Sequence, residues 1–385
     1  MTATLLIAGG GTGGHVFPAV AVAEAAQVLA DVEIVFVGTD RGVEARVIPA
    51  RGWRLERLEV QPMKGGGARR ALRGGLVAMR ATLRAARIVR RLRPRAVLSV
   101  GGYASGPATL AAALLGVPVA VLEPNSTVGL ANRLLAPFAR CAFVAWDEAT
   151  PRFRASTVRQ YGVPLRAGFA PRPSSQRDAA LRVLVMGGSQ GAAFLNERVP
   201  EALGHVRIEG RPLDVLHQAG RDREAPVGEA YARARIERAR VVPFIEDVAQ
   251  AIADADLVVA RAGAGTIAEI TAIGRASLLV PFPHAADDHQ ARNAQALARA
   301  GAAVCVLQAQ GDLLAVEVGR LLADDAARCA MADRARARGR PDAAMHVAKD
   351  LLALGAIPEY GRRGGGDERA LGEASPLRSS NGGRS

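Results

Sequence analysis

Short apolar runs recur along the chain, and longer stretches with helical spacing separate them. Apolar runs of this length between turn residues predict buried strands. Because helices alternate with the runs, the strands should lie parallel in sheets that are covered on both faces. The runs lie at residues 3–8, 32–38, 96–102, 118–125 and 141–146, and again at 181–186, 213–220, 239–245, 255–263 and 276–283.

The second half of the chain repeats the plan of the first half. Residues 181–199 again form an apolar run, a glycine-rich turn and a helical stretch. We therefore predict an α/β protein with two doubly wound, Rossmann-like domains that face a cleft beyond the carboxyl ends of their strands. A stretch rich in proline and serine at 161–178 marks the boundary. The predicted parts are an N-terminal domain at 1–163, a C-terminal domain at 164–340, a helix at 341–360 and a disordered tail at 361–385.

Composition excludes some classes of protein. The 385 residues are 49% apolar, which is enough for two large cores. We find no apolar run of about 18 residues and no basic segment at the start, so we expect neither a transmembrane helix nor a signal peptide. Cys141, Cys305 and Cys329 lie far apart without metal-ligand spacing. We therefore expect free thiols in a reducing cytoplasm and no metal site.

The net charge of +13 suggests nucleic acid, an anionic membrane or an acidic substrate as partner. Lys64 and Lys349 are the only lysines, so the arginine excess is typical of biased composition and only the placement of the arginines is informative. Aromatic residues make up 4% of the chain and form no stacking motif, so we expect no nucleic-acid partner.

The first glycine-rich turn leaves two functions open. Residues 9–14 match the G-x-G-x-x-G pattern that brings backbone N–H groups to a phosphate, and Pro18 fits the first turn of the helix that follows. A dinucleotide site also needs an acid at the end of the second strand, and Asp40 comes late. Such a loop has no use for His15, which therefore either hydrogen-bonds the loop or takes part in chemistry.

Other loops at strand ends carry polar groups suited to a nucleotide. Loops 101–107 and 187–192 can present N–H groups at helix N-termini, which favour anions, although each could be only a tight turn. Ser189 adds a hydroxyl donor. Glu269, near the start of a helix that opens at 264–266, can accept both hydroxyls of a ribose; the alternative is a solvated helix glutamate.

Polar side chains also gather near the start of a later helix. Gln290 and Asn293 carry amides that suit the hydroxyls of a sugar, and His289 lies beside them. The alternative is a polar helix start that Asp287 or Asp288 caps.

Eight motifs occur in order between about residues 4 and 355: GGGTGGHVFPAVAVAE, GGYASGP, GLANRLL, GGSQGA, HQAG, VVPFIEDV, RAGAGTIAE and VPFPHAADDHQARNA. Together they resemble the bacterial MurG family, the peptidoglycan N-acetylglucosaminyltransferases that convert lipid I into lipid II. The resemblance implies the GT-B glycosyltransferase fold. It also implies transfer of N-acetylglucosamine from UDP-N-acetylglucosamine, with inversion, to the 4-hydroxyl of undecaprenyl-pyrophosphoryl-N-acetylmuramyl-pentapeptide.

The resemblance further implies a place in the cell. The enzyme would serve cell-wall synthesis, and with it cell shape and division, as a peripheral protein on the cytoplasmic face of the inner membrane. It would need no cofactor, and the motifs leave open whether a divalent ion stimulates the reaction.

Site residues carry over by position. The resemblance makes His15 the candidate base and Glu123 a second catalytic candidate. It places the uracil against the backbone of Ile245, the ribose at Glu269 and the diphosphate at Ser189 and the loop 264–266. Tyr103, Gln190, His289 and Asn293 are further sugar or acceptor candidates. The implied contacts with UDP-N-acetylglucosamine are Thr12, Gly13, Gly14, Asn125, Arg166, Ser189, Ile245, Ala264, Gly265, Thr266, Glu269 and Gln290.

The chain departs from the family pattern at two places. It has LEPN at 122–125 where the family usually has His-Glu-Gln-Asn, and GVPLR at 162–166 where the family often has Gly-Asn-Pro-Val-Arg. Both departures bear on the acceptor side, and the donor motifs are intact.

Other functions remain as alternatives. A UDP-sugar epimerase of similar fold would make a free sugar from the donor alone. A non-enzymatic basic protein would bind RNA or a membrane. A nicotinamide dehydrogenase is disfavoured because the acid after the second strand is misplaced.

One segment concentrates the positive charge. Residues 68–95 contain ten arginines and no acid, and Leu72, Leu76, Met79 and Leu83 form one helical stripe. An amphipathic helix whose apolar side packs on the first sheet would explain the leucines. It would not explain the absence of acids, so we expect this helix, with residues 61–67, to dock the first domain on an anionic bilayer.

Overall fold

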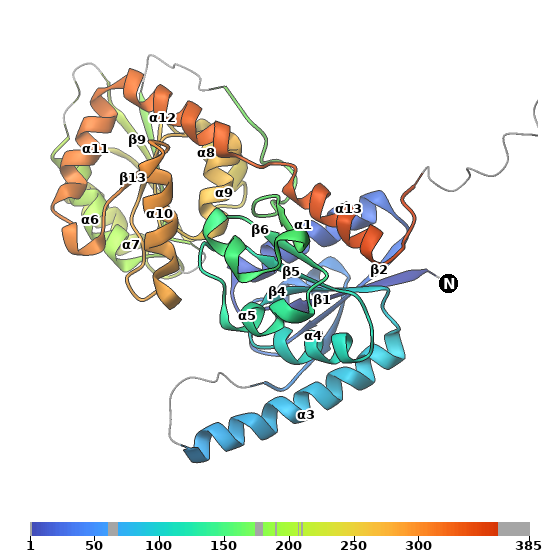
Figure 1. The fold of residues 1–385 in the computed structure, drawn as a ribbon. Helices are drawn as coiled ribbons and strands as arrows, with labels where there is room; N and C mark the ends of the chain where they lie inside the picture. The colour runs from blue at the N-terminus through green and yellow to red at the C-terminus, as the bar shows by residue number, and fades with distance from the viewer. Residues whose placement is uncertain are drawn as a thin grey trace, which may run out of the picture.

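Figure 1 shows the computed structural model, in which two domains each contain a parallel sheet with helices on both faces. The structure describes residues 2–60, 68–173, 180–188, 191–206, 208 and 211–360, without the side chains of 68–76, 155 and 286. The predicted fold class is confirmed, and the exact domain boundaries stay predictions. The predicted disordered tail lies outside the described residues.

The first sheet has the strand order β3-β2-β1-β4-β5-β6-β7, and all its neighbouring strands are parallel. Its central strands are apolar and almost wholly buried, because helices cover both faces. The strands are β1 (Ala3–Gly9), β2 (Val32–Gly38), β3 (Arg54–Arg57), β4 (Ala96–Gly101), β5 (Val119–Glu123), β6 (Cys141–Val144) and β7 (Val158–Gln160).

The second sheet repeats this arrangement in the order β10-β9-β8-β11-β12-β13. In each sheet the strand order reverses beside the first strand, between β1 and β4 and between β8 and β11. Ligands of such sheets bind at this switch point, outside the carboxyl ends of the strands. The strands are β8 (Leu181–Met186), β9 (Leu213–Gln218), β10 (Arg238–Val242), β11 (Leu257–Ala260), β12 (Ser277–Leu279) and β13 (Val304–Cys305).

Helices cover both faces of each sheet. The longer helices of the first half are α1 (Gly13–Leu29), α3 (Ala68–Leu92) and α4 (Ser105–Leu114), with short α2 (Glu44–Val47) and α5 (Leu130–Leu135). The second half contains α6 (Ala193–Gly204), α7 (Glu224–Arg233), α8 (Val248–Asp254), α9 (Ala264–Ile273), α10 (His289–Arg299), α11 (Leu313–Ala323), α12 (Asp325–Arg338) and α13 (Ala343–Leu354). Short 3₁₀ turns lie at 49–51, 136–138, 147–152, 155–157, 286–288 and 308–310.

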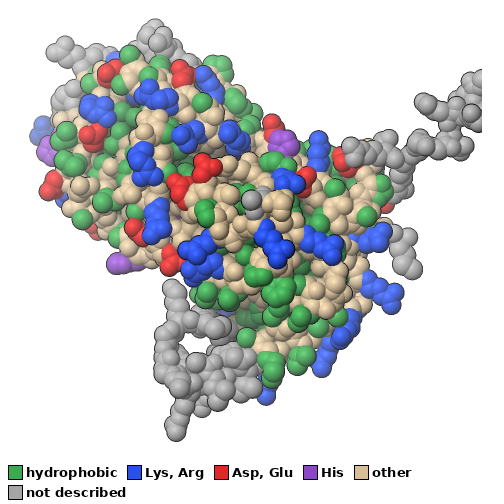
Figure 2. All heavy atoms as spheres, viewed as in Figure 1, with side chains coloured by type: hydrophobic (Ala, Val, Ile, Leu, Met, Phe, Trp, Pro, Cys, Tyr) green, Lys and Arg blue, Asp and Glu red, His purple; other side chains and the backbone are tan. Residues whose placement is uncertain are grey.

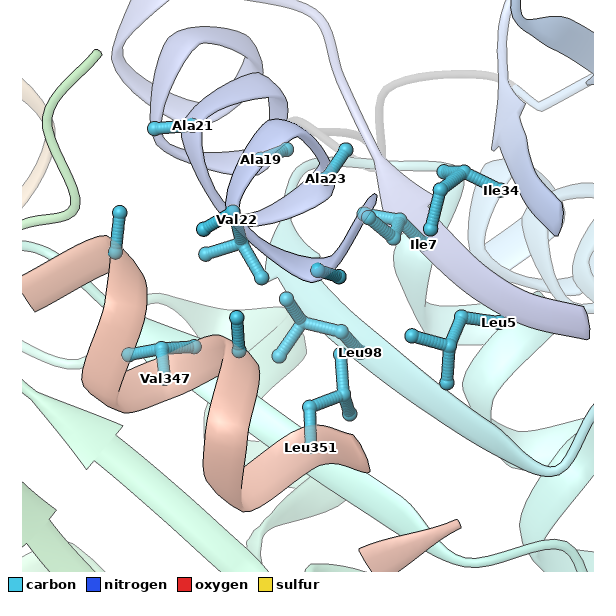
Figure 3. Packing of buried hydrophobic residues seen from close by; sticks show 14 of the residues in the cluster. Leu5, Ile7, Ala19, Ala21, Val22, Ala23, Ile34, Leu98, Val347 and Leu351 are labelled. Carbon is cyan, nitrogen blue, oxygen red and sulfur yellow. The ribbon is translucent and has the colours of Figure 1, made fainter. Parts of the chain in front are cut away.

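The last helix returns to the first domain. Figure 1 shows α13 beside α1, on the domain that the chain had left before β8. In Figure 3, Val347 and Leu351 of α13 meet Val22 of α1 and Leu98 of β4, and all four are buried. The chain therefore crosses between the domains twice, and its final helix completes the core of the first.

The basic helix α3 does not pack through its predicted stripe. Ala85, Ile88 and Val89 form its buried face, whereas Met79 and Leu83 are 54% and 57% exposed. The part of the stripe with described side chains therefore faces away from the sheet. The side chains of 61–76, which include the other two leucines and the segment before the helix, lie outside the description. Among the described helices, none combines the length and apolarity needed to cross a bilayer.

Two local predictions need correction. Helix α1 begins at Gly13, so Pro18 lies inside it rather than in its first turn. His15 consequently lies in the first turn of the helix rather than in the loop before it. Strands β3, β7 and β13 were not predicted, because they are short and partly exposed and so lack a long apolar run.

Candidate active site

A cleft of about 2450 Å³ lies between the two sheets. Its walls come from the loops after β1, β4 and β5 in the first domain and after β8, β11 and β12 in the second, where the topology places ligands. The cleft brings together most of the predicted site residues. Those that line it are Thr12, Gly13, Gly14, His15, Tyr103, Glu123, Asn125, Arg166, Ala264, Gly265, Thr266, Glu269, His289 and Gln290.

His15 stands at the start of α1. Its backbone N–H donates to the carbonyl of Thr12, and its Nδ1 lies 3.3 Å from the hydroxyl of Thr12. The ring reaches the β4 loop, since a Cβ on Gly101 would come within 3.0 Å of Nε2. Glycine at 101, with φ +89°, is therefore required both by the backbone and by the imidazole.

The surroundings of His15 favour its neutral form. Burial is the main cause that lowers its pKa, and His289 from the second domain lowers it further. The carbonyl of Gly10 and the charge of Glu44 act in the opposite direction. A neutral imidazole can accept a proton, as a general base must.

Glu123 ends β5 and is 2% exposed. One carboxylate oxygen accepts from the backbone and side-chain N–H groups of Asn125, at 3.1 and 3.3 Å. The other accepts from Gly129 N at 2.9 Å and Asn132 Nδ2 at 3.0 Å. Burial raises the pKa of Glu123, and these four donors oppose the rise. The carboxylate thus fixes the loop that presents Asn125 to the cleft, and its predicted catalytic role stays a prediction.

Glu269 and Arg166 both line the cleft, and their charges interact. Glu269 lies on α9, and burial raises its pKa to about 7, while the charge of Arg166 opposes the rise. The guanidinium of Arg166 lies 5.3 Å from the ring centre of Phe17 and 6.0 Å from that of Phe169. This cation–π packing holds Arg166 between α1 and the second domain.

The polar residues near the start of α10 differ in position: one lines the cleft and another is buried between the domains. Gln290 lines the cleft, and its side-chain oxygen accepts from Phe282 N at 3.0 Å. Asn293 is fully buried and does not line the cleft; its side-chain oxygen accepts from Ser126 N of the first domain at 3.2 Å. Asp288 occupies the N-cap of α10 but makes no side-chain cap, so capping by Asp288 does not account for this polar segment.

Ile245 is also absent from the lining, because its side chain is buried in the second core. Its neighbour Phe244 lines the cleft and is 55% exposed. Ser189 and Gln190 lie outside the described residues. Next to them, Gly191 packs tightly on the end of β9, since a Cβ on Gly191 would overlap the carbonyl of Ala219.

Arg261 is a cleft residue to which the sequence assigned no role. It follows β11 and donates to the carbonyls of Val280 and Pro281 and to the side chain of Gln308, at 3.0–3.2 Å. Its guanidinium also lies over the rings of Phe194 and Phe282. Arg261 thus connects three loops of the second domain. Its position at the start of the RAGAGTIAE motif was the available signal, but the general arginine excess concealed it.

The described residues contain no cluster of three or more His, Cys, Asp or Glu side chains able to hold a metal ion. The prediction of no metal or cofactor stays a prediction.

Family models match both halves of the chain. The glycosyltransferase family 28 N-terminal domain matches residues 5–144, and the glycosyltransferase family 28 C-terminal domain matches residues 182–347. Together they cover most of both sheets and most of the cleft, but not β7 or the cleft segment 163–166 between the two matched ranges.

Curated relatives share most of the sequence. A protein of Sorangium cellulosum (strain So ce56) is 54% identical over 365 residues, which cover 93% of this chain and 90% of the relative. A protein of Acidithiobacillus ferrooxidans (strain ATCC 53993 / BNL-5-31) is 45% identical over 355 residues, which cover 90% and 97%. Both are named UDP-N-acetylglucosamine--N-acetylmuramyl-(pentapeptide) pyrophosphoryl-undecaprenol N-acetylglucosamine transferase.

Solved structures agree with this result. The crystal structure of MurG from Acinetobacter baumannii matches with a TM-score of 0.77 and 33% identity, over 91% of this chain and 99% of that one. A UDP-GlcNAc 2-epimerase from Neisseria meningitidis, bound to UDP-GlcNAc, matches with a TM-score of 0.62 and 11% identity, over 92% and 100%. The likeness to the epimerase shows a shared fold and nothing more.

Proposed function

This chain belongs to glycosyltransferase family 28, and from that premise we propose how its cleft transfers N-acetylglucosamine from UDP-N-acetylglucosamine to undecaprenyl-pyrophosphoryl-N-acetylmuramyl-pentapeptide. The reaction converts lipid I to lipid II in peptidoglycan synthesis. The enzyme is a UDP-N-acetylglucosamine-dependent glycosyltransferase with the GT-B fold.

The donor binds to the second domain. The carboxylate of Glu269 accepts hydrogen bonds from the ribose hydroxyls, and the backbone of Ile245 meets the uracil. Gly263, at the N-cap of α9, has no side chain to cap the helix, so the N–H groups of its first turn, at 264–266, are open to the cleft. They and Ser189 bind the diphosphate, which the positive end of the helix dipole favours.

The acceptor binds to the first domain. Its 4-hydroxyl approaches His15, which removes the proton as the oxygen attacks the anomeric carbon from the face opposite UDP. The loop 12–14 closes over the donor from this side, and Asn125, Arg166 and Gln290 contact it from the cleft walls. Negative charge develops on the departing diphosphate, and the fixed dipoles of the donor loops stabilise it.

The positions of two candidate residues support a separate role for each domain. The candidate base stands on α1 at the switch point of the first sheet, and the candidate ribose acceptor stands on α9 at that of the second. His289 of α10 lies near enough to His15 to lower its pKa. These positions support a direct displacement, which requires a proton acceptor beside the sugar nucleotide.

Mass spectrometry of the products tests this function. The protein is incubated with UDP-N-acetylglucosamine and a short-chain lipid I analogue, and separately with the donor alone. We expect the acceptor to gain one N-acetylhexosamine, and the donor alone to give no epimerised sugar. An unmodified acceptor would contradict the transferase function, and a new free sugar from the donor alone would favour the epimerase.

We also propose that the enzyme attaches peripherally to the anionic surface of the inner membrane, on its cytoplasmic face. A lipid-linked acceptor has to be met at a bilayer. Met79 and Leu83 of α3 are exposed beside arginines, and Leu130, Leu134 and Phe138 are exposed near α5. Figure 2 shows hydrophobic side chains gathered on this part of the first domain, with lysine and arginine side chains along its edge. Such a surface combines apolar insertion with attraction to anionic headgroups.

A further inference from the structure

A buried carboxylate lies beneath the first glycine loop. Glu44 begins α2, after β2, and is 1% exposed. One of its oxygens accepts from Gly11 N at 2.7 Å. The other accepts from the backbone N–H of Thr39 at 3.0 Å and from its hydroxyl at 2.8 Å. A side chain from the second loop of the domain therefore holds the backbone of the first.

Three glycines make room for this carboxylate. A Cβ on Gly10, Gly38 or Gly42 would overlap the side chain of Glu44. The loop glycine at position 10 is therefore explained by contact with Glu44 rather than by contact with a phosphate. Gly11 has its N–H committed to the same carboxylate, which leaves that donor unavailable to a ligand in the cleft.

Hydrogen bonds connect the carboxylate to the candidate base. Glu44 fixes Gly11, and the next residue, Thr12, forms the N-cap of α1. The carbonyl of Thr12 accepts from His15 N at 3.1 Å, and its hydroxyl lies 3.3 Å from His15 Nδ1. The position of the imidazole thus depends on the backbone segment 11–15, and Glu44 binds Gly11 at the start of that segment.

The charge of Glu44 also reaches His15. The groups that act on the pKa of His15 are its burial and His289 of α10, which lower it, and the Gly10 carbonyl and Glu44 of α2, which raise it. When His15 takes a proton from the acceptor, positive charge develops on the ring. A fixed negative charge beneath the loop stabilises that charge at the moment of reaction.

We propose that Glu44 is a positioning residue for the transfer reaction, which holds the loop 10–14 so that Thr12 and His15 face the acceptor hydroxyl and which balances the charge that His15 gains. This inference rests on the proposed function of His15. Glu44 does not touch the substrate. It acts through Gly11 and Thr12, in the role that a third group has in orienting a catalytic base.

The substitution Glu44→Gln tests the proposal. Glutamine has the shape of glutamate but carries an NH₂ group in place of one oxygen. Because both oxygens of Glu44 accept hydrogen bonds, this NH₂ group must face an N–H or O–H donor and one side loses its hydrogen bonds. We expect kcat to fall about 10- to 100-fold, the range expected when catalytic groups are misplaced. The affinity for UDP, measured by calorimetry, should stay unchanged because the second domain holds the nucleotide. Glu33→Gln, which removes an exposed carboxylate from β2, is the matched control and should leave kcat unchanged.

A pH profile separates positioning from mere structural support. Activity should rise with pH as His15 loses its proton, and loss of the Glu44 charge lowers the pKa of His15. The acid limb of the kcat profile should therefore move to lower pH in Glu44→Gln. A folded variant with wild-type kcat, or with reduced kcat and an unmoved acid limb, would overturn the proposal.

A second variant serves if Glu44→Gln does not fold. Gly42→Ala keeps the carboxylate but places a methyl group where Oε2 now lies, and the backbone at Gly42 is not left-handed. We expect kcat to fall with UDP affinity retained, whereas Gly228→Ala, in open space on α7, should change neither. A Gly42→Ala variant with wild-type kcat would also overturn the proposal.

An NMR titration distinguishes failure of this proposal from failure of the proposed function. The ring of His15 is titrated in the full chain without substrate, and hydrogen exchange at Gly11 N–H is followed in the same samples. We expect a lower pKa of His15 and faster exchange at Gly11 in Glu44→Gln. If the wild type transfers no sugar, the proposed function fails, but the titration still tests whether Glu44 positions His15. An unchanged pKa of His15 and unchanged exchange at Gly11 in Glu44→Gln would reject that role of Glu44.

Discussion

At the scale of single residues, the proposed chemistry depends first on His15. His15→Ala removes the proton acceptor while the second domain stays intact, so we expect kcat to fall about 10²- to 10⁴-fold, as for loss of a general base. UDP affinity should change little. Steady-state kinetics and calorimetry on the same preparation check this. Normal turnover together with a lower melting temperature would show that the histidine only supports the loop.

The donor site depends on Glu269. Glu269→Ala removes a charged acceptor from the ribose, so UDP binding should weaken by roughly 1.5–3 kcal/mol, which is about one to two decades of affinity. Calorimetric titration with UDP measures this directly. An unchanged dissociation constant would remove Glu269 from the ribose site.

The raised pKa of Glu269 predicts that UDP affinity depends on pH. Burial raises the pKa of Glu269 to about 7 in the free protein, so the carboxyl is largely protonated below that pH. UDP affinity should therefore rise as pH increases through 7, with a slope of at most about tenfold per unit on the acid side. Glu269→Gln should bind more weakly and lack this slope. An equal slope in the two proteins would assign the pH dependence to another group.

Local sequence motifs predicted much of the candidate site. The residues that these motifs did not predict act through contacts between loops that are distant in the sequence. The loops around His15, Asn125 and Thr266 follow strand ends, so their sequence alone places them in the cleft. Arg261 and Glu44 act on loops that lie apart from them in the sequence, and no local pattern shows those contacts. Asn293 was expected beside the sugar and instead joins the two domains.

At the scale of elements, α3 is the part of the chain that we expect to meet the membrane. Binding to vesicles should be stronger with anionic lipids and should weaken as salt is added. Changing Arg80, Arg84 and Arg87 together to Gln should reduce co-sedimentation with anionic vesicles. The matched control changes three exposed arginines of the second domain, at 233, 235 and 240, to Gln.

The control variant should bind vesicles as the wild type does. Met79→Ser with Leu83→Ser should reduce binding even at high salt, because these side chains are exposed and apolar. Binding that is indifferent to headgroup charge, to salt and to all these substitutions would exclude α3 from the membrane surface.

A buried polar network joins three elements of the second domain. His217 of β9 lies 2.9 Å from the hydroxyl of Tyr231 on α7 and 3.1 Å from Asn196 Oδ1 on α6. Burial lowers the pKa of His217 to about 4, against 6.5 for an exposed histidine. Its stabilising effect is therefore complete above pH 6.5 and is lost as pH falls through 4.

The network thus predicts a loss of stability in acid. Between pH 7.5 and 4 the wild type should lose about 3 kcal/mol more than His217→Gln, which cannot titrate. Unfolding of the second domain, followed by hydrogen exchange in the strands beside β9, measures the difference. Parallel pH profiles for the two proteins would show that His217 is not the responsible group.

The long apolar strands were predictable at this scale, and the short ones were not. Strands such as β1, β5 and β8 are almost wholly buried and consist mainly of apolar residues. The strand β3 lies at the edge of the first sheet, where half-exposed, charged positions interrupt the pattern. The prediction of a helix at α3 was correct, but its buried face contains Ala85, Ile88 and Val89 rather than the predicted stripe that includes Met79 and Leu83.

At the scale of the whole molecule, the internal repeat predicted two domains and a cleft between them. It did not predict where the last helix packs. α13 follows the second domain in the sequence, and its apolar face fits the core beside α1 in the first. A pattern of apolar residues shows that a helix face is buried but not which surface covers it. The crossing of the chain back to the first domain therefore required the structure.

The central claim is that two domains hold donor and acceptor on opposite sides of one cleft, so that transfer occurs by a single direct displacement. The configuration of the new glycosidic bond tests this most directly. The protein is incubated with UDP-N-acetylglucosamine, in which the sugar is α-linked, and with a short-chain lipid I analogue, and NMR determines the anomeric configuration of the product. The account predicts a β-linked disaccharide. An α-linked product would contradict it, because retention requires a second displacement that this cleft is not proposed to perform.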